Sequence, residues 1–128
     1  MKKIITLLIL SFVFYSCANL FKKLTLFEIC MDCLYHEDYN NAIISCQRAT
    51  MEEPSNYSAF TFLGVAYAKT GQLEKSLESL NQAIQIEPDY YYTWKWKGVV
   101  LQHLGRDVES KFCIEKSKEL ETKSKKQK

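Results

Sequence analysis

The sequence predicts an all-α fold, an array of three helix–turn–helix units with about six helices. Three observations lead to this prediction: the sequence repeats with a period of about 34 residues, its apolar residues recur at helical spacing, and its 128 residues include only two Pro and four Gly. So few turn-forming residues disfavour an all-β fold. Because 47% of the residues are hydrophobic and 13% are aromatic, the chain has enough apolar material for one small domain.

The period emerges when the sequence is shifted by the spacing from Pro54 to Pro88 and compared with itself. Besides these two prolines, three pairs of residues are then identical: Ala49 and Ala83, Gly64 and Gly98, and Gly71 and Gly105. Four further pairs match in size or class: Cys46 and Leu80, Phe60 and Trp94, Tyr67 and Leu101, and Leu80 and Ile114. Matches of this number at one offset indicate that the chain consists of repeated units.

Within the unit 57–90, the apolar spacing predicts two helices. The first ends at Gly71, and the second ends before Pro88. Gly71 suits a tight turn between helices because glycine adopts a left-handed conformation without a Cβ clash. Pro88 cannot continue the helix that precedes it. The apolar positions are Phe60, Leu63 and Tyr67 in the first helix and Leu73, Leu77, Leu80 and Ile84 in the second.

These residues resemble the signature of the tetratricopeptide repeat (TPR), a family whose helix–turn–helix unit has the same period. The resemblance is strongest in 57–90 and weaker in 23–56 and 91–124, and it implies a TPR-like α-solenoid over 23–122. In the last unit Lys97, Ser110 and Ser117 depart from the Leu and Ala that are usual in the family. Stacking is required because a single hairpin cannot bury its apolar face.

A different pattern precedes the repeats. The chain begins with Met1 and two Lys, and an apolar run of twelve residues follows from Ile4 to Tyr15. This run is shorter than the roughly 20 residues of a membrane-spanning helix and suits an export signal. The segment 14–17 resembles the lipobox of bacterial lipoproteins, which implies a signal peptide at 1–16, a palmitate-type lipid on Cys17 and a lipid-proximal tether at 17–22.

Two other interpretations of the N-terminus remain open. Tyr15 departs from the small residue that is usual in a lipobox, and small residues at positions 16 and 18 also permit ordinary signal cleavage before Asn19. The apolar run could instead remain as an uncleaved anchor. The lipoprotein hypothesis predicts an exported protein that is lipid-anchored to a bacterial membrane, on the periplasmic side or at the cell surface.

The chain ends in a basic segment. From Lys116 onward there are six Lys and two Glu. Residues 123–128 contain no apolar anchor, so we expect a disordered, solvated tail there. Contact with anionic lipid headgroups is the alternative role of this segment.

The cysteines of the first unit allow three interpretations. Cys30 and Cys33 form a C-x-x-C pair, with His36 and Cys46 nearby. His36 would lie about 120° from Cys30 around a helix, so the three side chains would not converge on a metal ion. If Cys30 faces Ala42, then Cys46 is offset by about 6 Å along the helix axis, which strains a disulfide. Buried thiols are therefore expected, with a disulfide second and a metal site third.

Several function classes find no support. No glycine-rich phosphate loop occurs, the two His stand in different units, and the acidic residues are scattered. The sequence therefore predicts a protein that is not an enzyme and that needs no cofactor. The net charge of +2 gives no argument for nucleic-acid binding.

The TPR resemblance implies a concave groove lined by the first helix of each repeat. Relatives that clamp a peptide carboxylate use Lys and Asn where this chain has Phe27 and Met31, so that clamp is not expected. For the apolar residues Leu24 and Leu34, packing is the alternative. Carried over position by position, the groove residues are Phe27, Met31, Tyr35, Thr61, Val65, Lys69, Tyr92, Lys95, Val99 and His103.

Two functions follow as expectations. The first is a membrane-tethered interaction scaffold of the cell envelope, which binds a peptide segment or helix of an assembly component in its groove. The second is a structural or surface-exposed lipoprotein that associates with itself as a homo-oligomer.

Overall fold

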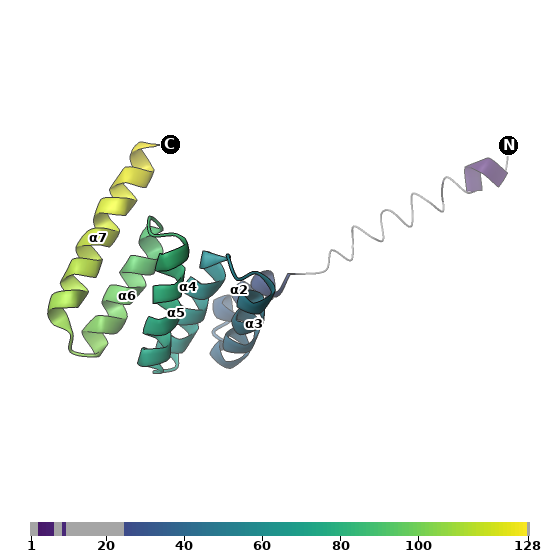
Figure 1. The fold of residues 1–128 in the computed structure, drawn as a ribbon. Helices are drawn as coiled ribbons and strands as arrows, with labels where there is room; N and C mark the ends of the chain where they lie inside the picture. The colour runs from purple at the N-terminus through teal and green to yellow at the C-terminus, as the bar shows by residue number, and fades with distance from the viewer. Residues whose placement is uncertain (1–2, 7–8, 10–24, 128) are drawn as a thin grey trace.

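The computed structural model describes residues 3–6, 9 and 25–127, and residues 25–127 form three antiparallel helical hairpins side by side (Figure 1). No strand occurs in the described part of the chain. The prediction of an all-α array with three repeats is confirmed. The helices are α2 (Leu26–Tyr35), α3 (Tyr39–Glu52), α4 (Tyr57–Lys69), α5 (Leu73–Ile86), α6 (Tyr91–His103) and α7 (Asp107–Lys126).

The ends of the helices follow from local sequence. Thr25 opens α2 with a capping box, in which its hydroxyl accepts from the amide of Glu28 while the Glu28 carboxylate accepts from the Thr25 amide. Gly71 and Gly105 take positive φ of 76° and 72° in the turns of the second and third hairpins. In the first hairpin, Glu37 takes the equivalent conformation with φ of 59°. A left-handed residue thus closes each of the three turns.

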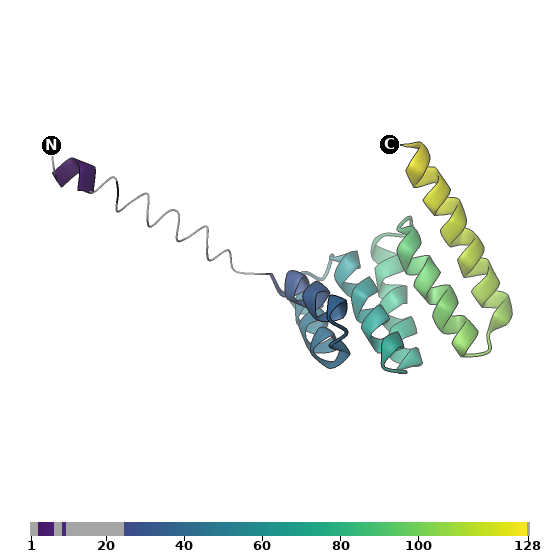
Figure 2. The ribbon, with the colours of Figure 1, turned by 180° about the vertical axis from the view of Figure 1, so that it is seen from behind.

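The three hairpins stack in chain order and curve (Figure 2). The first helices of the hairpins, α2, α4 and α6, contact one another in succession. Among the described helices, α3, α5 and α7 make no such contacts with each other. The first helices therefore lie on the inner side of the curve, as the TPR resemblance implies.

Each hairpin has one position of closest approach between its two helices. A Cβ added to Gly64 would lie 2.7 Å from Cγ of Leu80, and a Cβ added to Gly98 would lie 2.6 Å from Cδ1 of Ile114. The same two repeat positions in the first hairpin hold Cys30 and Cys46. The three pairs thus occupy the same place in their hairpins, which we call the notch. At the notch one residue must be small, or the two residues must be covalently bonded.

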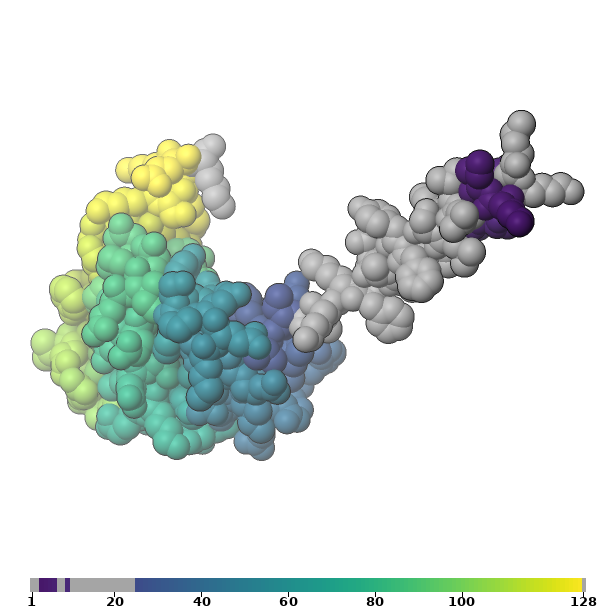
Figure 3. Space-filling model, turned by 45° about the vertical axis from the view of Figure 1, so that its right-hand side comes forward, coloured from purple at the N-terminus to yellow at the C-terminus, as the bar shows by residue number. Residues whose placement is uncertain are grey.

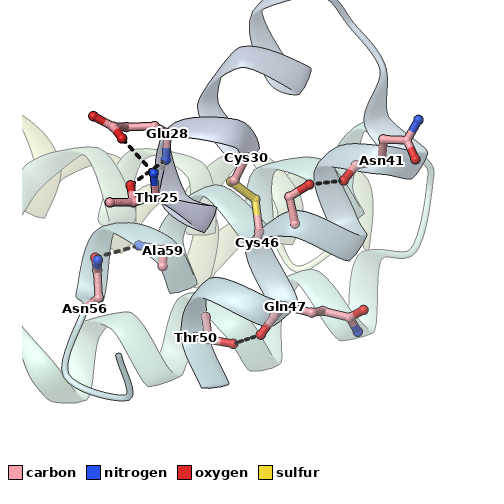
Figure 4. The surroundings of a disulfide bond; sticks show 10 residues. Thr25, Glu28, Cys30, Asn41, Cys46, Gln47, Thr50, Asn56 and Ala59 are labelled. Carbon is pink, nitrogen blue, oxygen red and sulfur yellow. Dashed lines mark hydrogen bonds between the residues drawn. A yellow bond between two sulfur atoms is a disulfide. The ribbon is translucent and has the colours of Figure 1, made fainter. Parts of the chain in front are cut away.

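Cys30 and Cys46 form a disulfide between α2 and α3, so the expectation of buried free thiols is wrong for this pair (Figure 4). Their Cα atoms lie 5.0 Å apart, well within the range for a disulfide. Both cysteines are fully buried. A side chain on one helix sits between two neighbours that are one turn apart on the other helix. Cys30 therefore faces Cys46 as well as Ala42, whereas the expected pairing considered Ala42 alone.

The face of α7 that would meet a further hairpin is polar. Three repeat positions show this. On α5 they hold Leu73, Leu77 and Ile84, which face the next hairpin, and on α7 they hold the exposed residues Asp107, Lys111 and Lys118. A shallow hollow of about 590 Å³ lies there between α6 and α7. Charged outer faces of this kind end a repeat array, because another hairpin could not bury them without cost.

The expectation of a disordered tail at residues 123–128 differs from the structure. Helix α7 continues to Lys126, and its end projects beyond the body of the protein (Figure 3). The Nζ atoms of Lys123 and Lys125 lie 2.6 and 2.7 Å from carboxylate oxygens of Glu119 and Glu121. Helical propagation past the last buried residue, Leu120, costs little when each Lys pairs with a Glu one turn before it.

Little of the N-terminal pattern falls within the described residues. Ile4, Ile5 and Ile9 are exposed. Among the described helices, none combines the length and the apolar character that crossing a membrane requires. Cys17 and the predicted tether lie outside the described residues.

Candidate functional site

A stripe of aromatic rings crosses the inner side of the array from α2 to α6. The ring of Phe27 lies 6.0 Å from that of Phe62, which lies 5.7 Å from the ring of Tyr92. Trp96 continues the stripe, 6.4 Å from Tyr92 in an edge-to-face contact. All four side chains are half-buried, so the rings support each other and still present one side to solvent.

A hollow of about 210 Å³ opens next to this stripe, between α4 and α6. We call it the socket. Its lining residues are Ala68, Lys69, Leu73, Trp96, Val99, Val100 and His103. Its apolar floor is continuous with the buried cluster of the second and third hairpins, which includes Leu77 and Leu101.

Two basic side chains stand at the socket, one from each helix. The Nζ atom of Lys69 lies 5.7 Å from the centre of the Trp96 ring, a cation–π contact. Nδ1 of His103 lies 2.8 Å from the carbonyl oxygen of Val99. Because a carbonyl only accepts, Nδ1 donates, and Nε2 is the ring nitrogen that can meet a ligand. Lys69 and His103 are both exposed.

The structure brings together five of the predicted groove residues. Phe27 and Tyr92 belong to the aromatic stripe, and Lys69, Val99 and His103 line the socket. Phe62 and Trp96, which the family positions did not include, complete the stripe. The sequence did hold a signal for them, because they are aromatic residues one period apart.

Thr61 and Val65 are buried, so they do not line an open groove as expected. Thr61 is 0% exposed, and its hydroxyl oxygen lies 2.7 Å from that of Thr93 across the contact between α4 and α6. Val65 is 6% exposed. Leu34, which stands at the repeat position of Ala68, packs against the first buried cluster. A larger side chain at that position leaves less space than beside Val99.

The remaining predicted residues lie apart from these contacts. Met31 is half-buried on α2. Tyr35 is 83% exposed at the end of α2, where its ring lies edge-on to His36. Lys95 is exposed, and its charge adds to the lowering of the pKa of Glu121, which comes chiefly from the hydrogen bond with Lys125. These residues extend the polar and apolar surroundings of the groove.

Four tyrosines gather where α4 and α6 begin. The ring of Tyr90 lies 5.1 Å from that of Tyr57 and 6.2 Å from that of Tyr92. Burial, followed by the charges of the neighbouring phenols, raises the pKa of Tyr90. Its hydroxyl therefore stays protonated and can act as a hydrogen-bond donor at neutral pH.

No three His, Cys, Asp or Glu side chains within 25–127 are placed to hold a metal ion. Burial raises the pKa of the Cys113 thiol, so it is a poor nucleophile, and the Cys33 thiol is unpaired on α2. What this surface offers is apolar area edged by cations, which is suited to binding.

Comparisons with known proteins agree with this geometry. The TPR repeat family matches residues 64–105, from within α4 to the turn after α6. Superkiller complex protein 3 of Homo sapiens is 30% identical over 64 residues, which is 50% of this chain and 4% of that protein. The match thus spans a small fraction of that relative's own length.

Solved structures with the same fold include two TPR domains with peptide ligands. The TPR2B domain of yeast Sti1, in a complex with an Hsp70 peptide, superimposes with a TM-score of 0.74 at 12% identity, over 77% of this chain and 78% of that one. The second TPR domain of Spaghetti (RPAP3), bound to the HSP90 peptide SRMEEVD, gives 0.69 at 22% identity, over 71% and 84%. Identities this low show the fold alone. The chain therefore carries a match to the TPR repeat within residues 64–105, and its hairpins have the TPR-like solenoid fold.

Proposed function

We propose that this protein is a membrane-tethered scaffold of the bacterial cell envelope and that it binds a peptide segment or helix of an envelope assembly component on its inner face. The aromatic stripe carries this proposal. Phe27, Phe62 and Tyr92 come from three different helices, and each ring is within 6.0 Å of the next. Half-buried rings of this kind are the anchors that dominate protein interfaces.

The chemistry of the groove favours an apolar ligand over a terminal carboxylate. Phe27 and Met31 stand where a carboxylate clamp would need Lys and Asn. An extended strand or one amphipathic helix suits a surface that spans three hairpins. The two solved relatives with bound peptides support binding on this fold, without identifying the ligand of this chain.

Two observations support export, which a tether at Cys17 requires. The disulfide between Cys30 and Cys46 is of the kind that forms outside the cytosol. Ile4, Ile5 and Ile9 of the apolar N-terminal run are exposed rather than packed in a core. Both fit a cleaved signal followed by a lipid-modified cysteine.

The groove is tested by affinity purification under mild detergent. Phe27→Ala or Tyr92→Ala should release a co-purifying envelope protein while circular dichroism remains helical, since losing an aromatic anchor costs about 2 kcal/mol or more. Lys75→Ala is the control, because Lys75 is exposed on α5. Release by the control and retention by both aromatic variants would assign binding to the outer face instead.

The tether is tested by metabolic labelling with an alkyne fatty acid. The wild-type protein should incorporate the label, and Cys17→Ala should abolish it. A soluble wild-type protein that begins at Asn19 would contradict the lipoprotein hypothesis and support ordinary signal cleavage.

Self-association is a second candidate function, favoured by a patch on the outer side of the third hairpin. Val108 is 83% exposed and Phe112 is 61% exposed, and the Phe112 ring lies 6.2 Å from Trp94. The second hairpin has Glu74 and Glu78 at the positions of Val108 and Phe112. The same scaffold position is thus apolar in one hairpin and charged in the other.

Light scattering tests this candidate. If the patch mediates self-association, Val108→Glu with Phe112→Glu should convert an oligomer to a monomer. Met51→Glu is the matched control, because Met51 is 78% exposed on α3. A wild-type protein that is monomeric in mild detergent would exclude the second candidate.

A further inference from the structure

The socket between α4 and α6 has the dimensions of a site for one side chain. Its volume of about 210 Å³ is below the roughly 300 Å³ at which pockets for small molecules begin. Ala68 opens this space, because the same repeat position in the first hairpin holds the larger Leu34. Trp96 forms one wall and also ends the aromatic stripe, so a segment lying along the stripe would reach the socket.

Lys69 is the one charged residue that lines the socket. Lys69 and His103 are its only ionisable lining residues, and no carboxylate lines it. The ammonium of Lys69 is held over the Trp96 ring, 5.7 Å from its centre, and is therefore positioned at the mouth. The ring of His103 is oriented by the hydrogen bond from its Nδ1 to Val99. The Lys69 ammonium complements an acidic ligand group beside an apolar one.

We propose that the partner of this groove is an acidic–apolar peptide segment, which inserts one large apolar side chain into the socket and places an adjacent Asp or Glu carboxylate on Lys69. This inference rests on the proposed function, because it assigns the partner's chemistry at the same groove. The socket supplies the affinity of the apolar anchor, and the Lys69 ammonium fixes which residue stands next to it.

Random peptides displayed on phage provide the probe. The full chain in mild detergent is panned in parallel with three variants: Lys69→Glu, Lys75→Glu and Tyr92→Ala. Peptides enriched by the wild-type protein should share a large apolar residue next to Asp or Glu. Lys69→Glu should instead enrich Lys or Arg beside the apolar residue. Lys75→Glu makes the same charge change on α5 and should keep the acidic preference.

Affinities of a synthetic enriched peptide sharpen the result. Replacing its acidic residue by the amide should weaken binding about tenfold to the wild-type protein, as expected for a charged hydrogen bond, and much less to Lys69→Glu. If enrichment depends on Tyr92 but shows no preference for an acidic residue, this inference is wrong, while the proposal that the groove binds a peptide still holds. Failure of every peptide to distinguish the wild-type protein from Tyr92→Ala would overturn the peptide-binding function and this inference with it.

Discussion

Within the first hairpin and within the third, the two helices approach each other at the same repeat position, but different kinds of residue make the contact. In the first, Cys30 and Cys46 are covalently joined across the contact between α2 and α3. In the third, Gly98 leaves a notch that the side chain of Ile114 fills. The third hairpin adds a hydrogen bond of 2.8 Å from the Ser110 hydroxyl to the carbonyl of Gly98, whereas the first has Ala42 at that position.

The difference shows that the notch, rather than any particular residue pair, is what the fold requires. The second hairpin uses the same solution as the third, with Gly64 and Leu80. A small-and-large pair holds two helices together under all redox conditions, because its stabilisation comes from packing. A disulfide holds them only where it remains oxidised, so the first hairpin alone depends on the compartment.

Removing the disulfide should have the largest effect on stability. Cys30→Ala with Cys46→Ala should lower the free energy of unfolding by about 3 kcal/mol, because the bond closes a loop with a sequence separation of 16. Urea unfolding with and without a reductant measures this. The reductant should destabilise the wild-type protein and leave the variant unchanged.

A transplanted pair gives the matched control. Cys30→Gly with Cys46→Leu recreates the Gly64 and Leu80 notch in the first hairpin. It should recover about 1 kcal/mol over the double-alanine variant, because the buried Leu outweighs the entropic cost of Gly in a helix. A wild-type protein that unfolds identically in both buffers would contradict the disulfide.

Filling the notch of the second hairpin should have the next largest effect. Gly64→Leu should cost about 1–3 kcal/mol, since even a Cβ there would lie 2.7 Å from Leu80. Gln82→Leu changes an exposed position on the neighbouring helix and should do little. Thermal unfolding compares the two, and equal melting temperatures would contradict the close approach.

Acid should loosen the end of α7, the smallest of the expected effects. Hydrogen bonds from Lys123 and Lys125 lower the pKa of Glu119 and Glu121, respectively. The carboxylates therefore favour the folded end above their unfolded pKa of about 4.3, and this contribution is lost as the pH falls through the folded pKa. Protection factors against amide exchange at residues 123–126, taken relative to the intrinsic rate at each pH, should fall between neutral pH and about pH 3, but they should not depend on pH in this way in Glu119→Gln with Glu121→Gln. Equal protection of that end at both pH values in the wild-type protein would argue against these ion pairs.

The sequence predicted the periodic part of this molecule well. Eight matches at a single offset, with Gly71 and Pro88 as end signals, define hairpins whose helices the structure confirms. The pairing of Cys30 with Cys46 was within reach of the same comparison, because Cys46 aligns with Leu80 and Cys30 with Gly64. It was missed because facing residues were counted one to one, whereas a helical side chain contacts two positions one turn apart.

The groove was less predictable because it depends on side-chain volume. Family positions indicated that Val65 and Val99 are equivalent, yet Val65 is buried whereas Val99 lines a hollow together with Ala68. The stripe likewise depends on how Phe62 of α4 leans toward Tyr92 of α6, and on how Trp96 leans toward Tyr92 one turn away on α6 itself. Periodicity fixes which helix face a residue occupies, and it does not fix what that residue touches across the next helix.

The charged outer face of α7 limits how this array could lengthen during evolution. A duplication that appended a new unit after residue 126 would bury Asp107, Lys111 and Lys118 beneath it, at a large desolvation cost. If a copy of residues 57–90 were instead inserted next to the original, it would pack its apolar faces against a hairpin on each side. The charged face of α7 would then remain at the end of the array. Longer homologous arrays should therefore differ in the number of internal units and retain a charged last helix.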